Sequence, residues 1–459
     1  MRGPHSVPRL TVGEEKEAKG LPMETILYAL GLILIAILGS PLYSVIGAVA
    51  LIAFISAGID TSAIMVELYR IASQPVLLAI PLFTFAGYLL AESKTPQRLV
   101  RLSQALFGWM RGGLAIVVLL TCAVFTAFTG ASGVTIVALG GLLYPILIKE
   151  HYSEKFSLGL LTTSGSLGLL FPPSLPLILY SMVAYNAQVS GGGASNVTID
   201  KLFVAGIVPG FIIVIVLALY SIRQGRIGSL PTVRFEWSNV LKSVKDAAWE
   251  IPLPFIILGG IYGGFFTATE AAAVTAFYVL VVEVFIYRDL KLFSDVPRIM
   301  KESTVLVGSI LVILGCAMGL TNYLIDEEVP MKLFTLIQQF ITSKVLFLVL
   351  LNIFLLIVGM MMDIFSAIIV VVPLIIPIAT AYEINPIHLG IIFLTNLEIG
   401  YLTPPVGLNL FISSFRFNKP ITEVIRSVIP FIMILLVALI IITYVPQLSL
   451  WLVELIWSQ

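Results

Sequence analysis

Charged residues are scarce in this chain. Asp, Glu, Lys and Arg make up 11% of its 459 residues, whereas an average soluble protein carries about 25%. Hydrophobic residues make up 59%, and the mean hydropathy is +1.05. This composition excludes a soluble enzyme, a disordered chain and a small disulfide-bonded domain. It predicts an all-α polytopic membrane protein, because helices satisfy their own backbone hydrogen bonds in lipid.

Cysteine and histidine are also rare. Cys122 and Cys316 both lie in apolar runs, which is typical of small buried side chains. The three histidines show no metal-ligand spacing, and 26 basic residues balance 26 acidic ones, so nothing predicts a nucleic-acid partner. No G-x-x-x-x-G-K-[ST] loop is present. A nucleotide-driven pump would therefore need a separate ATPase.

Several apolar stretches are too long for one crossing. As a single helix, 251–287 would reach about 55 Å across a hydrocarbon core of about 30 Å. We expect it to fold back near Gly263–Gly264. Just before it, the mixed segment Trp237–Trp249 is typical of an interfacial helix.

Basic residues mark the cytoplasmic side of membrane proteins. They cluster at 94–111, 223–245 and 288–301. By contrast, 188–200 contains no basic residue, and 322–331 carries three consecutive acidic ones. We therefore expect the last two segments to face outside.

Two segments 232 residues apart share the pattern Gly-x-x-x-Pro-Pro. They are Gly168–Pro173 and Gly400–Pro405, and the match extends over about 30 residues without a gap. Paired prolines in an apolar run are costly, because each removes a backbone donor and clashes with the preceding turn. Two such breaks at one offset indicate an internal repeat.

The same offset relates two polar interruptions further upstream. Thr129–Gly133 interrupts one long apolar stretch, and Asp363 lies at the equivalent point of another. Each half therefore predicts a helical hairpin with a polar tip, followed about 40 residues later by a broken helix. Corresponding broken helices are the best sequence indication of a transporter's binding site, because unwound carbonyls coordinate cations and helix amino ends favour anions.

Two acidic residues at these breaks have alternative interpretations. A carboxylate at mid-bilayer costs about 2.5–3.5 kcal/mol or more, which makes Asp363 a functional candidate. A purely structural helix cap is the alternative. Glu398 either has a functional role or caps the second break.

At this point the sequence resembles a known family. The strings FTGASG, SGSLGLLFPPS, GGFFTATEAAA and PIHLGIIFLTNLEIGYLTPPVGLNLF, with the region around Asp363, are similar to the large membrane subunit of tripartite ATP-independent periplasmic (TRAP) transporters. The resemblance covers nearly everything after about residue 25. It implies an elevator-type fold with inverted repeats, two re-entrant hairpins and two broken helices. Ala268 stands where members often have proline, and Thr135 lies near a position that is acidic in some relatives.

The family also implies a function and partners. It implies sodium-driven uptake of a small organic anion, such as a carboxylate or acidic sugar, across a bacterial or archaeal cytoplasmic membrane. A periplasmic substrate-binding protein would deliver the cargo, and a separate small four-helix subunit would complete the complex. Sodium would be the coupling ion, with no other cofactor.

Site residues follow from the resemblance, position by position. The first sodium site would use Thr129, Gly130, Ser132, Ser166, Gly168 and Pro172. The second would use Asp363, Asn396, Gly400, Thr403 and Pro404. The substrate would lie between the hairpin tips, near Ser174 and Asn409.

The expected domains follow from the repeat. They are a polar tail at 1–24, scaffold helices at 25–58, repeat 1 at 60–222, an interfacial helix and connecting membrane hairpin at 223–291, and repeat 2 at 292–455.

Other functions remain open at this stage. Re-entrant hairpins also build channel filters, so a passive channel is the main alternative, together with a transporter that works without a binding protein. A serine protease at Gly130–Gly133 would need a neighbouring base. His151 and His388 lie at the ends of apolar stretches, which argues against it.

Overall fold

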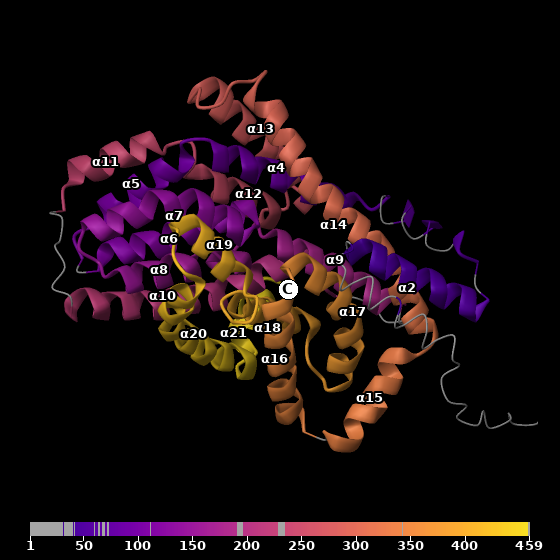
Figure 1. Cartoon of the computed structure of the whole chain (residues 1–459). Helices are drawn as coiled ribbons and strands as arrows, with labels where there is room; N and C mark the ends of the chain where they lie inside the picture. Colours follow the sequence, from indigo (N-terminus) through magenta and orange to yellow (C-terminus); the bar gives the residue numbers. More distant parts are fainter. Residues whose placement is uncertain are drawn as a thin grey trace, which may run out of the picture.

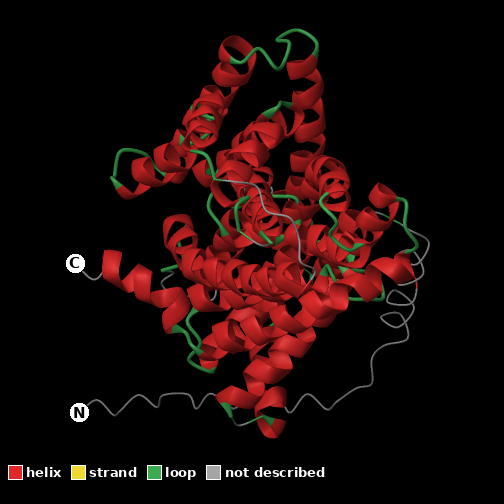
Figure 2. Cartoon of the chain, turned by 90° about the vertical axis from the view of Figure 1, so that its left-hand side faces the viewer, coloured by secondary structure: helices red, strands yellow, loops and turns green. Residues whose placement is uncertain are grey.

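The structure, a computed structural model, is built from helices and turns, with no strand among the residues it describes (Figure 2). The expected tail at 1–24 lies outside the described residues. These are 31, 40, 42–58, 60–62, 65, 66, 69, 70, 73–110, 112–190, 196–227, 235–341 and 343–457.

The helices follow one another along the chain as labelled in Figure 1. The first part contains α2 (Leu42–Ala57), the 3-10 helix η1 (Pro75–Leu78), α4 (Ala79–Glu92), α5 (Thr95–Phe107), α6 (Gly113–Thr129), α7 (Ser132–Lys149), α8 (Glu154–Ser164), the 3-10 helix η2 (Leu167–Leu170), α9 (Leu175–Ser190) and α10 (Ile199–Ile227). The middle part contains α11 (Trp237–Asp246), α12 (Pro252–Tyr262), α13 (Ala268–Val281) and the π-helical turn η3 (Val282–Ile286). The last part contains α14 (Asp295–Asp326), α15 (Val329–Phe340), α16 (Lys344–Met361), α17 (Ile364–Ala381), α18 (Pro386–Gly400), α19 (Leu408–Phe417), α20 (Ile421–Tyr444) and α21 (Gln447–Trp457).

The described helices fit a protein that crosses the membrane several times. Seven are long and apolar enough to span it, or eight if the bent pair at the first break counts as one span. The fold-back expected within 251–287 is confirmed. α12 ends before a turn in which Gly264 has φ +71°, and α13 starts at a capping box between Thr267 and Glu270. Such a box satisfies two backbone donors at a helix start.

Two helical hairpins carry the polar interruptions at their tips. Hairpin 1 is α6 with α7, and hairpin 2 is α16 with α17. The bounds of α17 are those of α7 shifted by the 232 residues of the repeat. Gly130 makes the first tip with φ +65°, a conformation that favours glycine, and Asp363 caps α17 at the second. Both predicted hairpins are confirmed.

Helices of each repeat pack on helices of the other repeat. α9 from the first repeat packs on α17, and its equivalent α19 packs on α7. Likewise α20 packs on α8, while α10 packs on α18. This reciprocity is the pattern that a two-fold relation between repeats produces. The hairpins and broken helices of both halves therefore share one core.

At both breaks a glycine allows close backbone contact with the hairpin. A Cβ on Gly168 would lie 2.3 Å from the Ala123 carbonyl oxygen of α6. A Cβ on Gly400 would lie 2.5 Å from the carbonyl carbon of Gly359 in α16. Real Cβ atoms do not approach backbone this closely, so each glycine is required by packing. The shared motif thus places each break against the first helix of its own hairpin.

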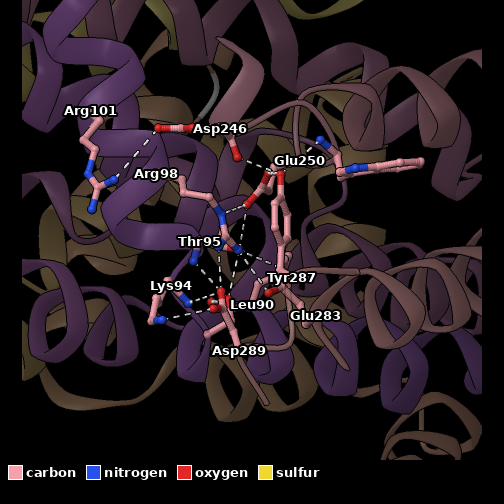
Figure 3. Close-up of polar contacts among 12 residues, drawn as sticks. Leu90, Lys94, Thr95, Arg98, Arg101, Asp246, Glu250, Glu283, Tyr287 and Asp289 are labelled. Carbon is pink, nitrogen blue, oxygen red and sulfur yellow. Dashed lines mark hydrogen bonds and ion pairs between the residues drawn. The ribbon is translucent and has the colours of Figure 1, made fainter. Parts of the chain in front are cut away.

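Helix α5 is attached to the middle part of the chain by a buried charge cluster (Figure 3). Arg98 donates from Nη1 to Asp289 at 2.6 Å and from Nη2 to Glu283 at 3.1 Å, and its Nε donates to Glu250. Its guanidinium also lies 3.8 Å from the ring centroid of Tyr287. Buried charges persist in proteins only when paired, and here one guanidinium joins three segments.

The cluster also affects the ionisation of Arg98. Burial alone would lower the pKa of its guanidinium, but the hydrogen bond to Asp289 and the charges of Glu250 and Glu283 raise that pKa above its ordinary value. The residue therefore stays charged.

The predicted interfacial helix is confirmed as a helix, α11, which packs beside α5 (Figure 1).

Candidate transport site

The two hairpin tips line one cavity of about 840 Å³. Gly130–Val134 and Asp363–Phe365 form one wall. Tyr88 and Glu92 of α4 and Glu302 of α14 also line the cavity. Tips that are distant in sequence therefore meet at one site, to which α4 and α14 contribute as well.

The tip of hairpin 1 is fixed from behind by the second repeat. Ser132 Oγ donates to Asn409 Oδ1 at 2.7 Å, and Asn409 Nδ2 donates to the Thr162 carbonyl at 3.4 Å. Thr162 Oγ1 in turn bonds Ser413 Oγ at 2.9 Å. All four side chains are buried. This chain of bonds joins α7, α8 and α19 into one rigid unit.

Asp363 has a structural role as well as a place in the cavity wall. Its Oδ1 accepts from the backbone N–H groups of Phe365 and Ser366 at 3.0 and 3.1 Å, and its Oδ2 accepts from Ser366 Oγ. These bonds cap α17. The carboxylate nevertheless stays exposed to the cavity. The structure therefore shows the helix cap, and a role of the exposed carboxylate in binding sodium stays a prediction.

Two predicted sodium ligands carry buried oxygens without a hydrogen-bond partner in the described structure. They are Thr129 Oγ1, at the end of α6, and Asn396 Oδ1, in α18. The amide nitrogen of Asn396 is bonded, to Asn352 Oδ1 at 2.7 Å and the Ile392 carbonyl at 2.8 Å. Buried polar atoms are nearly always satisfied. Unpartnered oxygens beside helix breaks have the chemistry that a small cation requires.

The remaining predicted residues lie at the two breaks. Ser166 and Pro172 flank η2, which contains Gly168; Gly400 ends α18, and Thr403 and Pro404 follow it. The cavity lining includes Gly130, Ser132 and Asp363, but neither Ser174 nor Asn409. Ser174 Oγ donates to the Leu169 carbonyl, and Asn409 supports the tip as described. The sequence predicts the substrate near Ser174 and Asn409, and in the structure neither residue lines this cavity.

Glu398 does not cap the break. The residue is 1% exposed, and neither carboxyl oxygen has a partner among the described residues. An unpaired buried carboxylate is so costly that such a group takes up a proton or binds a cation.

Sequence reasoning missed the contribution of α4 and α14 to the cavity. Arg298 of α14, which is not in the lining, donates to Glu92 at 2.7 Å and to Glu302 at 3.2 Å, so both lining glutamates are ion-paired. The sequence indicates Arg298 only as a marker of the cytoplasmic side. Glu302 stands four residues after Arg298 on the same helix, whereas the pairing with Glu92 needs the tertiary fold.

The comparisons with known proteins agree with this geometry. Residues 27–448 match the family model described as the DctM component of the tripartite ATP-independent periplasmic transporter. The chain belongs to this TRAP family. It is a transporter permease rather than an enzyme, and a multi-pass membrane protein.

Named TRAP relatives align over most of the chain. The C4-dicarboxylate TRAP transporter large permease protein of Pseudomonas aeruginosa is 37% identical over 88% of this chain and 92% of its own length. An ectoine/5-hydroxyectoine TRAP large permease of Ruegeria pomeroyi is 30% identical over 94% of this chain and 99% of its own. Among solved structures, the YdaH transporter of Alcanivorax borkumensis has a similar fold. Its TM-score is 0.62 at 13% identity, with 95% of this chain and 99% of that chain covered.

Proposed function

We propose that this chain is the large permease of a TRAP system that takes up a small organic anion with sodium. A substrate-binding protein delivers the anion, a small four-helix subunit completes the complex, and the site moves by an elevator mechanism. The observation that carries the proposal is the cavity in which two repeat-related tips face α4 and α14. Relatives are named for C4-dicarboxylate and ectoine transport, which supports small polar cargo.

The charge of the cavity supports cation coupling. Its lining includes Glu92, Glu302 and Asp363, but no lysine or arginine among the described residues. Arg298, outside the lining, pairs with both glutamates, so the repulsion of a free organic anion comes from the carboxylate of Asp363. Sodium bound at the two breaks, with Thr129 and Asn396 among its ligands, supplies the positive charge that the cavity lacks. Coupling then follows from electrostatics, because the anion binds well only after the cations.

The packing supports movement as a rigid body. The reciprocal contacts and the Ser132–Asn409 bond hold both hairpins together, whereas the buried Arg98 cluster holds the start of α5 to the middle part. We assign the first group to a transport domain and the second to a stationary scaffold. Two repeats related by a two-fold axis offer two nearly equivalent positions for such a domain.

Accumulation in proteoliposomes tests the proposal. The permease, its small subunit and loaded binding protein should concentrate a dicarboxylate against its gradient when sodium is higher outside. Dissipating the sodium gradient should abolish accumulation. Equilibration without accumulation would favour the channel alternative, since a channel cannot concentrate its solute. Full uptake without the binding protein would favour an independent transporter.

A further inference from the structure

A second cavity lies between the amphipathic helices α5 and α11. Its volume is about 310 Å³. Arg101 and Trp109 line it from the α5 side, and Glu236, Lys242 and Asp246 from the α11 side. The cavity lies at the basic end of the molecule, and the transport mechanism uses none of these residues.

The charges of this cavity are mixed and loosely paired. Arg101 approaches Asp246 only to 4.0 Å, and both side chains are well exposed (Figure 3). Lys242 forms no ion pair with any residue in the described part of the chain. Among the described residues, the Glu236 carboxylate accepts a neutral hydrogen bond from Asn239 at 2.8 Å and forms no ion pair. Two cations and two carboxylates thus face one polar space without neutralising each other at close range, which suits a zwitterionic ligand.

The surroundings place this polar space at the level of lipid headgroups. On α11, Trp237, Leu241 and Val244 form a stripe at helical spacing, and the first two are 69% and 66% exposed. Trp109 and Phe235 form an edge-to-face pair beside it, with ring centroids 6.5 Å apart. An amphipathic helix with such a stripe lies in the membrane surface, and tryptophans favour the headgroup level.

We propose that the cavity binds the headgroup of a phospholipid with a primary ammonium, of the phosphatidylethanolamine type. Its phosphate binds Arg101 and Lys242, and its ammonium donates hydrogen bonds to Asp246 and Glu236. The acyl chains follow the apolar stripe of α11. A choline headgroup has no N–H to donate, and a glycerol headgroup has no cation for the carboxylates. The bound lipid joins the middle of α5 to α11, one helical turn from Arg98.

Lipid titration of the purified, delipidated full-length chain tests this proposal. Native mass spectrometry and thermal unfolding should both be followed with phosphatidylethanolamine, phosphatidylcholine and phosphatidylglycerol of identical acyl chains. We expect phosphatidylethanolamine to bind about tenfold more tightly than the other two, since one hydrogen bond to a charged group contributes about 1.5–3 kcal/mol. Inorganic phosphate should not displace it.

Three variants assign the contacts. Lys242→Gln should weaken binding of phosphatidylethanolamine and phosphatidylglycerol about tenfold, by removing a phosphate contact. Asp246→Asn should abolish the preference for phosphatidylethanolamine over phosphatidylglycerol. Lys245→Gln is the matched control, because Lys245 is on the same helix but outside the lining, and it should change nothing.

Each contrary outcome overturns the proposal. Equal binding of the three lipids by the unmodified chain, or tightest binding of phosphatidylglycerol, would exclude ammonium recognition. Equal losses in Lys242→Gln and Lys245→Gln would show that surface charge alone attracts lipid. Displacement by inorganic phosphate would show an anion site without lipid specificity.

Discussion

Ser132 at the tip of hairpin 1 donates a 2.7 Å hydrogen bond to Asn409, which lies 277 residues further along the chain. The bond joins the tip of one repeat to the helix that follows the break of the other. Because both side chains are buried, the tip cannot open alone without leaving a polar group unsatisfied. A site built this way is expected to move as a unit.

Distance measurements between spin labels test that expectation. Ile148 of α7, Phe415 of α19 and Leu241 of α11 are all exposed and tolerate labels. The distance between labels at 148 and 415 should stay nearly constant with and without sodium and binding protein. Distances from either position to 241 should change by many ångströms. Comparable changes in all three pairs would instead indicate local gating and exclude the elevator mechanism.

Two substitutions of Asp363 separate the effect of its negative charge from the effect of its helix cap. Asp363→Asn keeps a good N-cap, so the melting temperature should change little, whereas Asp363→Ala should lose about 1 kcal/mol of stability. If the carboxylate stabilises bound sodium, both variants should need more sodium for half-maximal uptake. The measurement is sodium-dependent uptake alongside thermal unfolding. Unchanged sodium dependence in a well-folded Asp363→Asn protein would assign the residue to capping alone.

The glycines at the breaks should tolerate no side chain. Gly400→Ala would place a Cβ 2.5 Å from backbone of Gly359, and Gly168→Ala would place one 2.3 Å from backbone of α6. Both variants should lose most uptake and purify in low yield. Gly308→Ala in α14 is the control, because nothing lies within 4 Å of its added methyl group. It should keep full uptake and be slightly stabilised, by about 0.5–1 kcal/mol.

The buried charge cluster makes a strong prediction for stability. Arg98→Gln leaves Glu250 and Glu283 without a cation and leaves Asp289 only the exposed Lys94 at 3.4 Å, so we expect a loss of about 3–5 kcal/mol. Arg101→Gln, one turn away, removes an exposed 4.0 Å ion pair and, in the delipidated protein, should cost less than about 1 kcal/mol. Thermal unfolding of both purified variants gives the comparison. Equal stability of the two would contradict the anchoring role of Arg98.

The sidedness of the fold can be tested with single cysteines. After replacement of Cys122 and Cys316, a cysteine at Asp326 should react with an impermeant thiol reagent added to intact cells. A cysteine at Lys245 should not. The acidic end of the molecule, at Asp326, is separated from the basic end by the length of α14, because its 32 residues span roughly 48 Å. Labelling of position 245 from outside would reverse the proposed orientation.

Local chemistry explains which parts of the molecule could be predicted from the sequence. The Gly-x-x-x-Pro-Pro breaks and the tip at Thr129–Gly133 are visible because proline and glycine interrupt apolar helices wherever they stand. The offset of 232 then relates the halves without any knowledge of the fold. Both hairpins and the fold-back at Gly263–Gly264 follow from this reasoning.

The contribution of α4 and α14 to the cavity could not be found in the same way. Glu302 stands four residues after Arg298 and looks like an ordinary helix-surface pair, and only tertiary packing brings Glu92 to Arg298. Arg98 similarly looks like a marker of the cytoplasmic side, because its partners lie more than 150 residues away. Charge pairing over such distances leaves no periodic or spacing signal.

The exchange of partners between repeats has a consequence for how the chain is made. Hairpin 1 is synthesised long before α19, which covers it. At about 5–20 residues per second, the 277 residues between Ser132 and Asn409 take roughly 14–55 s to appear. During that interval a polar, glycine-containing tip stands in the membrane without its partner. The nascent first half must therefore be shielded by lipid or by an insertion chaperone, and a ribosome stalled between the repeats would leave a product that quality-control proteases can recognise.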